Sequence, residues 1–222
     1  MPIQSNIKEL RNTLPEHVTL VAVSKTKPVA DILEAYQAGQ RIFGENRVQE
    51  LTEKQPVLPE DIQWHLIGHL QTNKVKYIAP FVTLIQGVDS LRLLKEIDRQ
   101  AKRSNRRIDC LLQMFIAEEE TKFGLSEQEL EEIIHSEEFK SFENIKVIGL
   151  MGMATYTEFD DQIKKEFTHL KTIFDTHKSH ITPNFELTTL SMGMSGDYKI
   201  AVASGSTMIR VGSTIFGNRT IV

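Results

Sequence analysis

The sequence predicts a single α/β domain over residues 1–222, with a mainly parallel sheet closed into a (β/α)8 barrel. Eight short runs rich in Val, Ile and Leu recur along the chain, and most are apolar on both faces. That pattern is typical of parallel strands covered by helices on one side and by a packed interior on the other. Segments with helical periodicity lie between the runs. The 222 residues suit a compact barrel, since this fold usually takes about 250 residues and rarely fewer than about 200.

The predicted strands are, in chain order, Val18–Val23, Arg41–Phe43, Ile62–Ile67, Val82–Gln86, Ile108–Phe115, Ile145–Met151, Phe185–Leu190 and Met208–Val211. An open doubly wound sheet is the alternative, but it uses about five or six strands and usually carries a glycine-rich turn after the first. No G-x-G-x-x-G follows the first run, and no linker or repeat divides the chain. The closed barrel in one domain is therefore favoured.

Three segments between the strands carry helix signals. Pro28–Ala38 has apolar residues at i, i+3, i+4 and i+7, after a proline suited to the first helical turn. Leu91–Ala101 follows Asp89-Ser90, an N-cap pair, and a capping box that starts at Ser126 precedes Leu130–Ile134.

Composition narrows the function classes. Lys and Arg total 26 against 30 Asp and Glu, a formal charge of −4 that gives no general attraction for nucleic acid or anionic lipid. The one cysteine, Cys110, rules out an intramolecular disulfide framework and a cysteine-based zinc site, and it favours a reducing cytoplasmic setting. No apolar run approaches the about 18 residues of a membrane span, and the first residues lack the apolar core of a signal peptide. We expect a cytoplasmic, unexported protein.

Polar residues that directly follow the strands are the candidates for chemistry in a barrel, because the site is built at the strands' carboxyl ends. Val21, Val23 and Lys25 share a face, so Lys25 projects toward the barrel mouth. Desolvation there would lower the pKa of the amine and allow it to form a Schiff base with a carbonyl compound. Most strand-end lysines simply extend to water, so this residue alone does not decide the function.

Small and hydroxyl-bearing residues follow the last two predicted strands. Barrels commonly hold a phosphate there, and Ser195, Gly212 and Ser213 offer hydroxyl and backbone N–H donors for one. Turn formation is the plainer interpretation of either loop alone. Arg210 lies within the apolar run just before, where a buried guanidinium needs an acceptor from an ion-pair partner or a ligand.

Five motifs together resemble the pyridoxal phosphate homeostasis proteins, single-domain relatives of alanine racemase. They are Val21-Ala22-Val23-Ser24-Lys25-Thr26-Lys27-Pro28, Phe43-Gly44-Glu45-Asn46-Arg47-Val48-Gln49-Glu50, Trp64 to Lys74, Leu190 to Asp197, and Gly205-Ser206-Thr207 through Phe216-Gly217. The resemblance implies a barrel of the alanine racemase N-terminal-domain type that holds pyridoxal 5′-phosphate (PLP) as a Schiff base on Lys25. It also implies the other cofactor-binding residues, which are Asn46, Met192 with its neighbours to Met194, Ser195, Arg210 near the pyridine nitrogen, Gly212 and Ser213. Ser191 or Ser206 are alternative phosphate ligands.

The resemblance implies a carrier or regulator of PLP in vitamin B6 homeostasis, not an efficient enzyme. An arginine at the pyridine nitrogen makes the ring a poorer electron sink. None of the four tyrosines shows the motif of a racemase's second acid or base. We expect eight strand and helix units to use up these 222 residues, without the second domain of alanine racemase. PLP-dependent apoenzymes are the expected partners, and the chain is expected to be a monomer or weak dimer. A PLP-dependent racemase and a phosphate-binding barrel enzyme without PLP are the alternatives.

The remaining features carry weaker interpretations. Gly152, Thr155 and Phe123 depart from the family pattern, and we expect these departures to affect only the rim of the site. His65 and His69 have metal-ligand spacing for a helix, but the first lies in a predicted strand and no carboxylate completes the set, so no metal is expected. Cys110 is interpreted as a buried small hydrophobe, and the basic run 102–107 as a solvated helix end.

Overall fold

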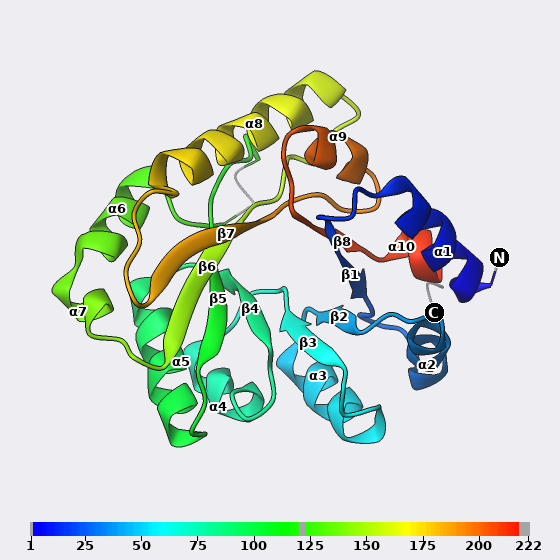
Figure 1. Ribbon diagram of the computed structural model, residues 1–222, viewed down its shortest axis with the longest axis horizontal. Coiled ribbons are helices and arrows are strands. Elements are labelled where there is room, and N and C mark those ends of the chain that lie inside the picture. Colours follow the sequence, from blue (N-terminus) through cyan, green and yellow to red (C-terminus); the bar gives the residue numbers. More distant parts are fainter. Residues whose placement is uncertain (1, 120–122, 218–222) are drawn as a thin grey trace.

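The computed structural model describes residues 2–119 and 123–217, and its eight parallel strands form a closed barrel in chain order (Figure 1). The strands are β1 (Thr19–Val23), β2 (Ile42–Glu45), β3 (Gln63–Leu66), β4 (Leu84–Val88), β5 (Ile108–Gln113), β6 (Ile145–Met151), β7 (Phe185–Ser191) and β8 (Met208–Val211). All eight predicted strands are confirmed, and none of their ends differs from the prediction by more than two residues. The barrel closes where Val21 of β1 pairs with Arg210 of β8.

Helices surround the barrel on the outside (Figure 1). They are α1 (Ile3–Thr13), α2 (Val29–Gln37), α3 (Val48–Lys54), α4 (Val75–Ile78), α5 (Leu91–Arg103), α6 (Glu127–His135), α7 (Glu137–Lys140), α8 (Asp160–His177), α9 (Tyr198–Ala203) and α10 (Ser213–Phe216). The predicted caps are present: Ser90 Oγ accepts from Leu93 N–H, and Ser126 forms a capping box with Glu129. No helix in the described ranges is long and apolar enough to cross a membrane.

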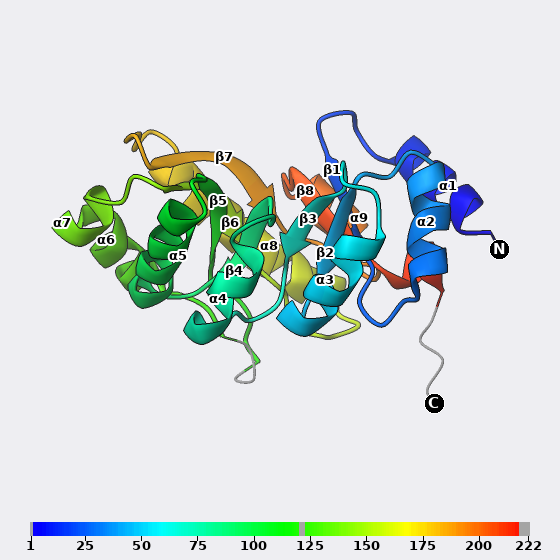
Figure 2. The same cartoon turned by 90° about the horizontal axis from the view of Figure 1, so that it is seen from below.

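The two ends of the described chain meet on one side of the barrel (Figure 2), where α1 lies beside α2 and α10 (Figure 1). The Asn6 side-chain amide donates to the carbonyl of Ile215 at 2.8 Å, which joins α1 to α10. Because α10 follows β8 directly, this contact holds the last turn of the barrel, and with it one wall of the mouth, against the first helix.

Side-chain alternation divides the apolar residues into two cores. Val21, Leu84, Leu111, Met151 and Met208 fill the barrel interior, while a larger core lies between the strands and the helices. Six polar or charged residues on the strands are also buried, Glu45, His65, Gln86, Gln113, Ser191 and Arg210. The strands therefore carry polar side chains below the mouth, where buried polar groups must find partners.

A glycine permits the closest approach between two strands. A Cβ atom on Gly149 of β6 would lie 1.8 Å from the carbonyl oxygen of Thr189 of β7. The register between these strands also shifts next to this residue. Only a residue without a side chain allows β6 and β7 to pair at this point.

Candidate functional site

A cavity of about 600 Å³ opens at the carboxyl ends of the strands, a volume typical of small-molecule sites. Residues that follow β1, β2, β3, β6, β7 and β8 contribute to its lining. Six of the seven predicted cofactor-binding residues line it, Lys25, Asn46, Ser195, Arg210, Gly212 and Ser213. Closure of the barrel therefore brings residues near the start of the chain, such as Lys25, together with residues near its end, such as Ser213.

Lys25 lies just beyond β1 in a tight turn, half-buried against the cavity. Thr26 follows it with a φ of 64°, in the left-handed region that β-branched residues rarely adopt. Two hydrogen bonds hold this turn: Thr26 N–H donates to Glu50 Oε1 at 2.5 Å, and Lys27 N–H donates to the carbonyl of Ser24 at 3.0 Å. The surrounding contacts thus fix a strained backbone, as is common at functional sites.

A buried polar cluster supports the turn from below. The Lys54 ammonium group donates to Glu45 Oε1 at 2.8 Å, to the carbonyl of Ser24 at 2.8 Å and to Glu50 Oε1 at 2.6 Å. Ser24 Oγ also donates to Glu45 Oε1, at 2.6 Å. Burial raises the pKa of the Glu45 carboxyl, and the hydrogen bonds from Lys54 and Ser24 oppose that shift. This cluster joins Ser24, which follows β1, to β2 and α3, and Glu50 connects it to the turn that carries Lys25.

Hydrogen-bond donors gather on the β8 side of the mouth. Ser195 Oγ accepts from the backbone N–H groups of Gly212 at 3.2 Å and Thr214 at 3.4 Å. Ser213 lines the cavity beside them. Backbone N–H groups and hydroxyls clustered in this way suit an anion such as a phosphate.

Arg210 brings a buried positive charge to the cavity. Its side chain is 4% exposed, Nη1 donates to Ser191 Oγ at 2.7 Å, and Nη2 donates to the carbonyl of Gly152 at 3.0 Å. Burial lowers the pKa of the guanidinium to about 10, so it stays protonated at neutral pH. Gly152, one of the departures from the family pattern, holds Arg210 through its carbonyl oxygen. The contact is made by the backbone, which explains why it does not need a particular side chain at this position.

Met192, predicted to line the cofactor, is not among the residues that line the cavity. Ser191 contacts interior residues, so alternation sends Met192 outward into the core between strands and helices, where it is fully buried. Gly193, with a φ of +101°, turns the chain, and Met194 lines the cavity instead. Neither of the alternative phosphate ligands lines it: Ser191 bonds to Arg210, and Ser206 is fully buried against backbone carbonyls.

Met153, Tyr156 and Asp197 are among the lining residues that were not predicted from the sequence. Tyr156 is 96% exposed on the loop after β6. Asp197 accepts from Met194 N–H at 2.5 Å, and burial raises the pKa of its carboxyl. The strand-end rule, applied to β6 as it was to β1, would have indicated Met153 and Tyr156.

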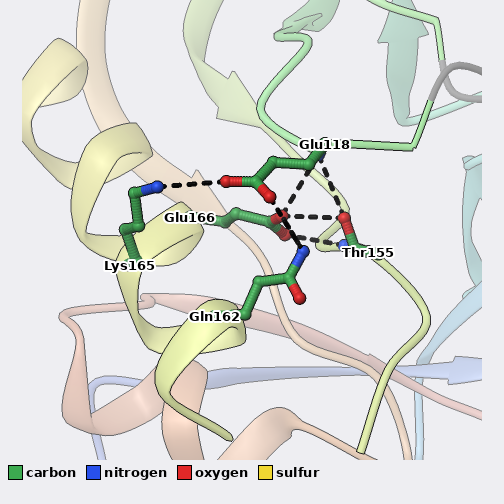
Figure 3. A network of polar contacts seen from close by, with 5 residues as sticks. All are labelled: Glu118, Thr155, Gln162, Lys165 and Glu166. Atoms are coloured by element: carbon green, nitrogen blue, oxygen red, sulfur yellow. Dashed lines mark hydrogen bonds and ion pairs between the residues drawn. The ribbon is translucent and has the colours of Figure 1, made fainter. Parts of the chain in front are cut away.

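Glu166 of α8 ties two rim loops together (Figure 3). Its buried carboxylate accepts from Thr155 N–H at 2.7 Å, Thr155 Oγ1 at 2.7 Å, Glu118 N–H at 3.2 Å and Gln162 Nε2 at 3.3 Å. Lys165 pairs with the Glu118 side chain at 3.0 Å. The loops after β5 and β6 are thereby held together beside the cavity wall that carries Tyr156.

The weaker candidates have other roles. His65 Nδ1 lies 3.0 Å from Gln86 Nε2 inside the barrel, whereas His69 is exposed and its Nδ1 lies 3.1 Å from Asp89. Cys110 is buried in β5, and burial raises the pKa of its thiol. The basic residues at 102 and 103 form the last turn of α5, as predicted.

Comparison with known proteins agrees with the geometry. The family model "Alanine racemase, N-terminal domain" matches residues 2–220. A pyridoxal phosphate homeostasis protein of Synechocystis sp. is 39% identical over 95% of this chain and 96% of its own length, and one of Aquifex aeolicus is 39% identical over 90% and 86%. The chain belongs to the pyridoxal phosphate homeostasis proteins of the alanine racemase N-terminal domain family. The resemblance predicted from its motifs is confirmed.

Solved structures of this family share the barrel. PipY of Synechococcus elongatus PCC7942 without PLP is 38% identical with a TM-score of 0.91, covering 97% of this chain and 100% of PipY. The structure of PipY with PLP bound has a TM-score of 0.88. An alanine racemase of Clostridium difficile 630 shares only the fold, at 16% identity and a TM-score of 0.80, and the match covers 98% of this chain and 60% of the racemase.

Proposed function

We propose that this protein binds PLP in the cavity as a Schiff base on Lys25, and that as a single domain over residues 1–222 it serves as a carrier or regulator of the cofactor. One observation carries the proposal: a single cavity gathers the Lys25 amine, the buried Arg210 cation and the donors around Ser195. These groups match the aldehyde, the ring nitrogen and the phosphate of PLP. The names of the relatives and the PLP-bound structure of PipY support the same ligand.

The charge on Arg210 supports a carrier over an amino-acid enzyme. PLP in enzymes supplies an electron-withdrawing ring, which works best when its nitrogen is protonated. A guanidinium has only donors, so Arg210 would donate to the ring nitrogen and oppose its protonation. We propose the cytoplasm as the compartment and PLP-dependent apoenzymes as the partners, in line with the cysteine content and the homeostasis role.

Tyr156 favours a second candidate function. A racemase needs an acid or base besides the lysine, and Tyr156 is a phenol in the cavity lining. Weak amino-acid racemisation is therefore the alternative. Its 96% exposure leaves the Tyr156 ring in solvent, which argues against a fixed proton donor.

The test of PLP binding is reconstitution with PLP followed by borohydride reduction. We expect a yellow protein whose visible band disappears on reduction, with a pyridoxyl adduct on Lys25 by peptide mass spectrometry. Lys25→Ala should remove the adduct while the protein stays folded, and the matched variant Lys95→Ala, at an exposed lysine on α5, should keep it. A colourless protein would leave only a phosphate-binding barrel, and an adduct on Lys27 would reassign the lysine.

Carrier and enzyme differ in what the loaded protein does. A carrier should pass PLP to an apoenzyme, restoring its activity faster than an equal concentration of unloaded protein, and should turn over amino acids well below about 1 s⁻¹. Racemisation at or above that rate, lost in Tyr156→Phe, would establish the second candidate.

A further inference from the structure

A chain of buried hydrogen bonds crosses the inside of the barrel. Arg210 Nη1 donates to Ser191 Oγ at 2.7 Å, Ser191 Oγ donates to Gln86 Oε1 at 2.7 Å, and Gln86 Nε2 lies 3.0 Å from His65 Nδ1. The four residues come from β8, β7, β4 and β3, and each is at most 4% exposed. Because β4 and β7 are not neighbours in the sheet, the Ser191–Gln86 bond spans the barrel interior.

The donors and acceptors of the four side chains give this series of hydrogen bonds one direction. Arginine has only donors, so Ser191 Oγ accepts from Arg210, and its own hydrogen is left to donate to Gln86 Oε1. The Gln86 amide therefore turns its NH₂ toward His65, whose Nδ1 must carry a lone pair and whose proton is on Nε2. Burial lowers the pKa of His65 to about 3, so the ring is neutral at physiological pH.

We propose that Ser191, Gln86 and His65 are positioning residues that fix the Arg210 guanidinium at the cavity. In every bond of the series the residue nearer Arg210 donates, so each following residue turns an acceptor atom toward Arg210 and the dipoles stabilise the buried positive charge. Ser191, Gln86 and His65 are not among the residues that line the cavity, whereas Arg210 is. Part of the proposal rests on the proposed function: if Arg210 faces the PLP ring, this chain sets the affinity and the spectrum of bound PLP.

A matched pair of serines separates positioning from mere stability. Ser191→Ala and Ser206→Ala each remove a fully buried hydroxyl, but Ser206 Oγ bonds only to backbone carbonyls and not to Arg210. We expect both to lower stability, and only Ser191→Ala to shift the visible absorption maximum of bound PLP and weaken PLP binding by about tenfold, as for loss of one well-placed hydrogen bond. Ser191→Thr, which keeps the hydroxyl, should restore both. Equal shifts in the two alanine variants would overturn the proposal.

A second measurement uses the PLP-free protein. Nitrogen NMR should show His65 protonated on Nε2 alone between pH 7 and pH 5, and the Arg210 guanidinium hydrogens should exchange faster in Ser191→Ala than in Ser206→Ala. Protonation of His65 on Nδ1, or unchanged exchange of the Arg210 hydrogens, would overturn the proposed series of hydrogen bonds whether or not PLP binds. If Ser191→Ala does not fold, Gln86→Met removes the amide at similar volume and should change Arg210 in the same direction. Failure of wild-type protein to bind PLP would sink the proposed function and leave the NMR test intact.

Discussion

The Nζ atom of Lys54 lies 2.8 Å from Oε1 of Glu45, and both side chains are buried beneath the turn that carries Lys25. The Lys54 ammonium group has three hydrogens, and its three acceptors are the Glu45 carboxylate, the Ser24 carbonyl and the Glu50 carboxylate. The pair therefore links the wall of the barrel to the strained turn at its mouth.

Loss of this lysine should destabilise the fold. Lys54→Met would leave Glu45 as a buried carboxylate without its cation, so we expect the free energy of unfolding to fall by about 3–5 kcal/mol in urea titrations. Adding Glu45→Gln should recover most of the loss, because the buried charge is then gone. The exposed pair of Lys95 and Glu138 is the control, and Lys95→Met should change stability by less than about 1 kcal/mol. Equal losses in the two lysine variants would contradict this assignment.

The Glu166 carboxylate (Figure 3) should control the opening of the two rim loops that it joins. Glu166→Ala removes the acceptor of the Thr155 and Glu118 amides, so their hydrogen exchange should accelerate at least about tenfold while the barrel strands keep their protection. Glu137→Ala removes an exposed carboxylate on α7 and should leave the rim amides unchanged. Unchanged exchange at Thr155 in Glu166→Ala would show that the loops are held by other contacts.

The close approach of β6 and β7 should tolerate no side chain. Gly149→Ala would place a methyl group 1.8 Å from the Thr189 carbonyl oxygen, so the strands must separate, and we expect a loss of at least about 3 kcal/mol and a melting temperature lower by about 10 °C. Gly196→Ala, with no atom within 4 Å of the new methyl group, should melt within about 2 °C of wild type. A stable Gly149→Ala protein would mean that the strands pair differently here.

Acid should weaken the fold through His65. Burial lowers the pKa of this ring to about 3 in the folded protein, against 6.5 when unperturbed, so between these values only the unfolded chain binds the proton. The contribution of the neutral His65 ring to the free energy of unfolding is complete above pH 6.5. It is lost as the pH falls toward 3, at up to about 1.4 kcal/mol per pH unit. From pH 7 to pH 5 wild type should lose about 2 kcal/mol more than His65→Gln, measured by urea unfolding at each pH. Parallel pH profiles for the two proteins would show that His65 is not the group responsible.

Much of the fold and part of the site follow from local sequence. The apolar runs become strands because both faces are buried, and alternation beyond Val23 correctly places Lys25 at the mouth. The helix N-caps at Ser90 and Ser126 involve residues only three positions away, so they could also be predicted from the sequence. Met192 shows the limit of this reasoning, because one turn at Gly193 decides which methionine reaches the cavity.

The sequence by itself determined the strand order, the lysine at the first strand's end and the family, because each follows from short segments of residues close together in the chain. Closure of the barrel decided the rest. Only the tertiary structure joins Ser191 to Gln86, which are 105 positions apart, and places the Gly152 carbonyl on Arg210. Such contacts depend on which strands face one another across the barrel interior. The side-chain periodicity of a single strand carries no information about the strand on the opposite side.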